Sequence, residues 1–121
     1  MPQKGAKYWK GKCDRLWSRL IRERDGCCIV CGNPRLQAHH LISRSAVFYR
    51  HNLENGVSLC AQCHEYNNKL SAHGAPWAFD DWMRRNRPDQ YAWWEKSRHS
   101  IIEGQKIDYK AIYKELEAAD G

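Results

Sequence analysis

The sequence LQAHHLISRS places two adjacent histidines, His39 and His40, in an apolar stretch and follows them closely with Arg44. A neutral imidazole can bind a divalent metal ion, and it can also accept a proton from water near pH 7. Adjacent residues of a β-strand project to opposite faces, so one histidine could reach an ion while the other approaches a substrate from a different side. The alternative is that one of the two is a core histidine hydrogen-bonded to the backbone.

Two Cys-x2-Cys pairs flank these histidines. Four thiolates in two such knuckles satisfy the tetrahedral coordination of Zn²⁺. Residues 32–59 separate the pairs, a longer interval than simple four-cysteine ribbons have, so an inserted unit with the histidines should lie between them. Two local redox pairs, or buried free thiols, are the alternative. We predict a structural Zn²⁺ site at four cysteines: Cys28, Cys31, Cys60 and Cys63.

Two cysteines lie outside these pairs. Cys27 could replace Cys28 as a ligand, but only Cys28 has the two-residue spacer that the second pair also has. Cys13 shares the apolar face of a predicted helix with Leu16 and Trp17, so we expect it in the core.

Hydrophobic periodicity divides the chain into elements that must position these residues. We expect a disordered start over residues 1–6, a basic amphipathic helix over 7–25, and a knuckle with a short strand after it. A second strand is expected near 56–59 and a short helix within 61–70. Three further helices are expected over 76–85, over 88–98, and after Asp108 as an N-cap.

Length and composition favour one small domain with a polyanionic partner. The chain has 121 residues, with 20 Lys and Arg against 14 Asp and Glu and a formal net charge of +6. No apolar stretch approaches the roughly 18 residues of a membrane span, and the N-terminus lacks the apolar region of a signal peptide. We therefore expect a cytoplasmic protein, in which metal binding is a better first explanation of the six cysteines than a disulfide framework.

The order Cys-x2-Cys, His-His, Asn55, Cys-x2-Cys-His64 resembles the HNH endonucleases over residues 24–64. Within that family, the stretches HHLISRS, NGVSLC and SAHGAPWAFDDW are most similar to phage-type members, including the NinG-like recombination nucleases. The resemblance implies an α+β fold: a small ββα-metal core with four-cysteine zinc knuckles over 26–73, flanked by an N-terminal helix and a helical C-terminal extension over 74–121. It also implies that residues 1–121 form a single nuclease domain.

The resemblance further implies a metal-dependent DNA endonuclease that hydrolyses phosphodiester bonds, in phage recombination, packaging or processing inside a bacterial host. His39 and His64 would bind the catalytic divalent ion, His40 would be the general base, and Asn55 would hold the hairpin that carries His40. The third ligand is His73 in the matching SAHG stretch, with Asn68 as an alternative.

His39 stands where many family members carry Asp. A neutral histidine in place of an aspartate removes one negative charge from the ligand set. This favours binding of Mn²⁺, Ni²⁺ or Zn²⁺ and argues against a strict dependence on Mg²⁺.

Arg44 is close enough to the histidines to contact a phosphate, and Arg50 and His51 could extend that contact. Arg19 and Arg22 belong to a basic series on the first helix that could follow a DNA backbone, although a solvated helix face would look similar. No cluster of Arg, Asn and Gln suggests base reading, so we expect little sequence specificity. A homodimer would explain double-strand cutting.

Two other functions use the same cysteines. One is a zinc-ribbon module that binds nucleic acid without catalysis, and it has no use for His40, Asn55 and His64 together. The other is a zinc module that docks a protein partner through its aromatic C-terminal helices, for which the basic charge has no purpose.

Overall fold

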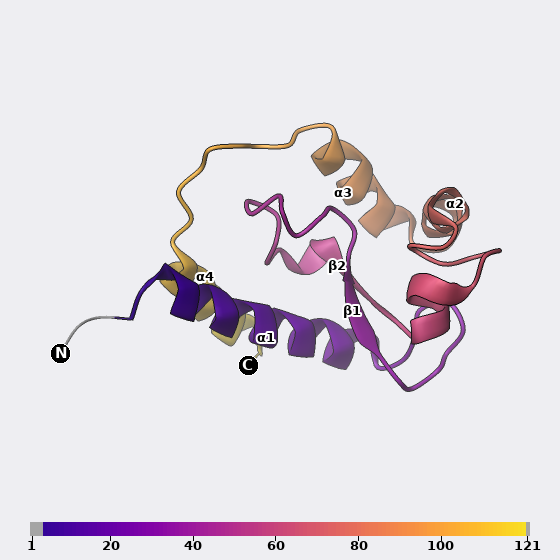
Figure 1. Ribbon diagram of the computed structural model, residues 1–121, viewed down its shortest axis with the longest axis horizontal. Coiled ribbons are helices and arrows are strands. Elements are labelled where there is room, and N and C mark those ends of the chain that lie inside the picture. Colours follow the sequence, from indigo (N-terminus) through magenta and orange to yellow (C-terminus); the bar gives the residue numbers. More distant parts are fainter. Residues whose placement is uncertain (1–3, 121) are drawn as a thin grey trace.

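The N-terminal helix α1 spans Ala6–Asp25 in the computed structural model, which describes residues 4–120 (Figure 1). The helix begins one residue before the predicted range and ends, as predicted, where Gly26 takes a left-handed conformation with φ 73°. Of the expected disordered start, residues 1–3 lie outside the described residues.

The sheet is a hairpin of two antiparallel strands, β1 (Gln37–His40) and β2 (Gly56–Leu59). His40 pairs with Gly56, and a Cβ atom at Gly56 would lie 2.5 Å from the Trp17 side chain and 2.7 Å from that of Ile21. Glycine at this position therefore lets the hairpin approach α1 closely. The mixed α+β fold class is confirmed, with β2 at the predicted residues.

The remaining elements are short. A 3₁₀ turn, η1 (Leu53–Asn55), leads into β2, and a single π-helical segment, η2 (Gln62–Tyr66), follows it. The prolines at 76 and 88 open α2 (Pro76–Asn86) and α3 (Pro88–Arg98), as their fixed φ favours. The last helix, α4 (Tyr109–Asp120), begins where the Ala111 N–H donates to the Asp108 carboxylate at 3.1 Å.

Two hydrophobic clusters hold these elements together. The larger one joins the hairpin and the knuckles to α2 and α3, and it includes Phe79, Met83 and Trp94. The smaller one lies between α1 and α4, and it includes Cys13 and Leu116. A long connector leaves α3 and returns the chain to α1, so that α4 lies along the first helix (Figure 1). Within residues 4–120, no helix is long and apolar enough to cross a membrane.

Candidate active site

The four paired cysteines meet in one cluster, with their ligand atoms within 4.8 Å of one another. The sulfur atoms of Cys31 and Cys60 lie 3.5 Å apart. Two thiolates on one tetrahedral Zn²⁺ would lie about 3.8 Å apart, given Zn–S bonds of about 2.3 Å. The first knuckle turns at Gly32, where φ is 81° and the N–H donates to the Cys28 carbonyl at 2.9 Å. This donor set fits a zinc ion.

Backbone N–H groups stabilise the thiolate form of Cys28. Burial alone disfavours its ionised form, but N–H groups of the knuckles outweigh burial and lower its pKa to about 7. The pKa of Cys63, by contrast, is raised by burial and by the neighbouring thiols. Four sulfur atoms so close together become favourable as thiolates only when a cation shares them.

A second cluster brings together His39 from β1, His64 from η2 and His73 from the following loop. Their rings surround one point, with centroid separations of 4.9 Å, 5.0 Å and 4.7 Å. The loop is held by two backbone bonds, from the Ala72 N–H to the Cys63 carbonyl at 2.9 Å and from the His73 N–H to the His64 carbonyl at 2.8 Å. The structure thus brings together the three histidines that the sequence named as metal ligands.

The protonation of His64 is set by Gln37, the first residue of β1. His64 Nδ1 lies 2.6 Å from Gln37 Oε1, and an amide oxygen can only accept, so Nδ1 carries the proton. The lone pair is therefore on His64 Nε2, which lies 3.1 Å from His73 Nε2. Two imidazole nitrogens on one tetrahedral ion would lie about 3.3 Å apart, given Zn–N bonds of about 2.0–2.1 Å. This histidine cluster also fits a divalent metal ion.

Burial and neighbouring charges favour the neutral forms of His39 and His64. Burial, together with the charges that His64 and His73 can carry, lowers the pKa of His39 to about 3. The pKa of His64 is also lowered, mainly by burial. Neutral imidazoles are the form that binds a metal ion.

His40, the next residue of β1, is held from two sides. Its ring stacks on Trp17 of α1, with centroids 4.0 Å apart. Its Nε2 lies 3.0 Å from the Arg50 carbonyl oxygen, which can only accept, so the proton is on Nε2 and Nδ1 is the basic nitrogen. Burial lowers the pKa of His40 to about 4, so the ring is neutral at pH 7. Nδ1 of His40 is therefore the ring nitrogen that can accept a proton.

Asn55 is fully buried and fixes the segment that follows β1. Its Oδ1 accepts from the Ile42 N–H at 2.6 Å, and its Nδ2 donates to the carbonyls of Ile42 and Tyr49 at 3.0 Å and 3.2 Å. The side chain therefore replaces backbone partners for the loop that leads away from His40.

Residues 28–69 match the family model described as HNH endonuclease. This part of the chain is therefore similar to HNH endonuclease domains. The match contains both cysteine pairs and His39, His40, Asn55 and His64, while α1, His73 and the C-terminal helices lie outside it. No curated protein and no solved structure is significantly similar to the chain.

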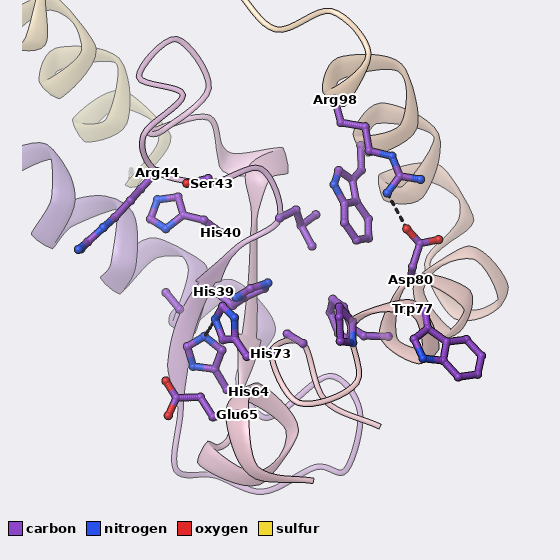
Figure 2. A pocket seen from close by; sticks show the side chains of 16 residues that line it. His39, His40, Ser43, Arg44, His64, Glu65, His73, Trp77, Asp80 and Arg98 are labelled. Carbon is purple, nitrogen blue, oxygen red and sulfur yellow. Dashed lines mark hydrogen bonds and ion pairs between the residues drawn. The ribbon is translucent and has the colours of Figure 1, made fainter. Parts of the chain in front are cut away.

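His39, His40, His64 and His73 open onto a cavity of about 1020 Å³. Figure 2 shows His39, His64 and His73 together on one side of it, with His40 and Arg44 next to them. Across the cavity lie residues of α2 and α3, among them the ion pair between Asp80 and Arg98. Converging imidazole nitrogens, a further imidazole and a nearby arginine are groups of the kind that phosphodiester hydrolysis uses.

Other basic residues lie away from this cavity. Arg19 pairs with Glu23 at 3.1 Å and with Asp120 at 3.0 Å, and Arg22 bonds back to the Ser18 carbonyl at 3.1 Å. Neither lines this cavity. The contact of Arg19 and Arg22 with DNA thus stays a prediction about a separate face of α1.

Two residues that position the histidines were not identified from the sequence. Trp17 was assigned only to a helix core, and Gln37 was not singled out. Neither contact is local, since 27 residues separate Gln37 from His64. A polar residue two positions before His39 on the same strand projects to the same face, and this was the available signal for Gln37.

Proposed function

We propose that this chain is a metal-dependent DNA endonuclease. The observation that carries the proposal is the meeting, at one cavity, of three converging imidazoles with a fourth whose ring is held by the Arg50 carbonyl. A zinc-ribbon module that only binds nucleic acid needs the cysteine cluster and makes no use of this second set.

His40 is the general base in this proposal. With Nε2 donating to the Arg50 carbonyl, Nδ1 accepts the proton of the attacking water. Asn55 is a positioning residue, because it holds the segment after β1 in place. Arg44, which is exposed and lines the same cavity, binds a phosphate oxygen next to the scissile bond.

His39, His64 and His73 would hold the catalytic ion, and Gln37 would orient His64 as outer partners of metal-bound histidines do. A bound divalent ion stabilises the charge that grows on the phosphate and on the leaving 3′ oxygen. Three neutral nitrogen ligands suit Mn²⁺, Ni²⁺ or Zn²⁺ better than Mg²⁺, which prefers oxygen. The cysteine cluster would hold a structural Zn²⁺.

DNA is the substrate in this proposal because the net charge is +6 and the matched family consists of endonucleases. Contacts to the DNA backbone, with little base reading, agree with the arginines near the cavity. The biological setting we propose, phage DNA recombination, packaging or processing in a bacterial cytoplasm, rests on the phage-type sequence stretches.

Cleavage of supercoiled plasmid tests the proposal. Protein that retains its cysteine-bound zinc but lacks other ions is supplied with Mg²⁺, Mn²⁺, Ni²⁺ or Zn²⁺ in turn. We expect nicking or linearisation that depends on the added ion. Plasmid left intact by every ion, with DNA binding retained, would instead support the zinc-ribbon binding module.

A further inference from the structure

An acidic residue of α1, outside the segment that matches the HNH model, is connected to the proposed general base. The Asp14 carboxylate accepts hydrogen bonds from Nε and Nη2 of Arg50, both at 2.8 Å, and from Nε2 of the buried His51 at 2.6 Å. These hydrogen bonds join residues that are 36 and 37 positions apart in the sequence. They fasten the loop before η1 to the first helix.

Arg50 in turn makes contacts with two other residues of the site. Its carbonyl oxygen accepts from His40 Nε2 at 3.0 Å, which decides where the His40 proton lies. Its Nη1 donates to the Arg44 carbonyl at 3.2 Å, at the other end of the same loop. Arg50 therefore contacts the base through its carbonyl oxygen and the backbone of the cavity-lining Arg44 through its guanidinium.

We propose that Asp14 is a positioning residue for this site, acting through the side chain and the carbonyl of Arg50 on His40. The proposal rests on the proposed nuclease function for its kinetic consequence. Its structural part, the effect of Asp14 on the imidazole of His40, can be measured without any cleavage assay.

The loop has other anchors, so the loss of Asp14 should leave the fold in place. Asn55 holds the Tyr49 carbonyl, and Trp17 Nε1 donates to the Asn52 carbonyl at 2.9 Å. The Asp14 side chain is itself 37% exposed. Partly exposed ion pairs contribute little to stability, whereas a small displacement of a catalytic group can slow a reaction greatly.

Asp14→Asn is the most informative variant. It keeps the shape of the side chain but turns one acceptor into an N–H₂ group, which faces the N–H donors of Arg50 or His51. Asp81→Asn is a matched control, because Asp81 is also paired with arginines, at 2.6 Å and 3.0 Å, and its side chain is 42% exposed. Asp81 does not line the cavity.

The first measurement is the tautomer of His40, read from ¹⁵N chemical shifts of histidine-labelled protein at pH 8. The His40 signals are those that disappear in His40→Gln. We expect the proton on Nε2 in the unmodified protein and in Asp81→Asn, and a mixture of both tautomers in Asp14→Asn. Identical His40 spectra in all three proteins would overturn the proposal, whether or not the protein cuts DNA.

The second measurement is the kinetics of cleavage. We expect Asp14→Asn to lower kcat roughly 10–100-fold with KM and Tm nearly unchanged, as for other outer positioning groups. Arg50→Gln should act similarly, and the double variant should be no slower than either single one. Unchanged kcat in Asp14→Asn would refute the positioning role. An unmodified protein that never cuts would refute the proposed function instead, and the ¹⁵N spectra would still decide the structural part.

Discussion

His64 Nε2 and His73 Nε2 lie 3.1 Å apart, although one belongs to the π-helical segment η2 and the other to the loop that follows it. Gln37 keeps the proton of His64 on the opposite nitrogen, so the His64 lone pair points toward His73. A proton on His73 Nε2 or a metal ion would satisfy this lone pair, and in the function we propose the third imidazole, that of His39, completes a metal site.

The first prediction concerns the affinity of this cluster for Mn²⁺ or Ni²⁺. His64→Ala removes a ligand and should abolish measurable binding in calorimetry, while Gln37→Ala removes only the outer partner and should weaken binding roughly 10–100-fold. His99→Ala, an exposed histidine outside the cavity, is the control and should bind normally. Equal affinity in His64→Ala would show that the ion binds elsewhere.

The second prediction concerns the stability of protein with no ion at the histidines. The pKa of His39 is about 3 in the folded chain, against an ordinary value of 6.5, so unfolding allows this residue to take up a proton. Its contribution is complete above pH 6.5 and is lost as the pH falls toward about 3. Within that window the loss is about 1.4 kcal/mol for each pH unit.

We would measure urea unfolding of the unmodified protein and of His39→Gln at several pH values between 7 and 5. Comparing the two proteins separates the effect of His39 on the free energy of unfolding from acid release of zinc, which both proteins share. The free energy of unfolding should fall less steeply with acid in the variant. Equal slopes would mean that the folded protein does not depress the pKa of His39.

The third prediction concerns the structural zinc. Cys60 is buried in the cysteine cluster, so Cys60→Ser should lose zinc, measured by elemental analysis, and should unfold at a much lower temperature. Cys27→Ser is the matched control, since Cys27 stands next to the cluster without belonging to it. If Cys60→Ser kept the zinc content and Tm of the unmodified protein, the cysteines would have another role.

The fourth prediction concerns contacts with phosphate. The logarithm of DNA affinity should fall linearly with the logarithm of salt concentration, and Arg44→Ala should reduce that slope by roughly 0.9. The same titration on Arg19→Ala and Arg22→Ala asks whether DNA also reaches α1. A slope unaffected by Arg44→Ala would remove this residue from the interface.

Local patterns were sufficient to predict the elements and to name the members of the two clusters that could hold a metal ion. Proline at 76 and at 88 marks the helix starts, and the repeated Cys-x2-Cys spacing indicates one shared ion. The strand at 56–59 follows from turn residues and apolar alternation nearby. These signals act over a few residues, so the sequence displays them directly.

Contacts between distant segments were not predictable in the same way. Nothing in the vicinity of Asp14 indicates that it meets Arg50, because the meeting depends on how the hairpin packs on α1. Arg50 and His51 were expected to extend the contact with phosphate, but the structure places both side chains on Asp14. The return of α4 to α1 likewise depends on packing of the smaller hydrophobic cluster.

Single-turnover cleavage by His40→Ala tests whether His40 is the general base of a DNA-cleaving site. We expect the rate to fall at least about 100-fold while zinc content and DNA affinity stay the same, as expected when a general base is removed. His99→Ala, measured in parallel, should cut at the unmodified rate. Cleavage by His40→Ala at the unmodified rate would show that His40 is not the general base.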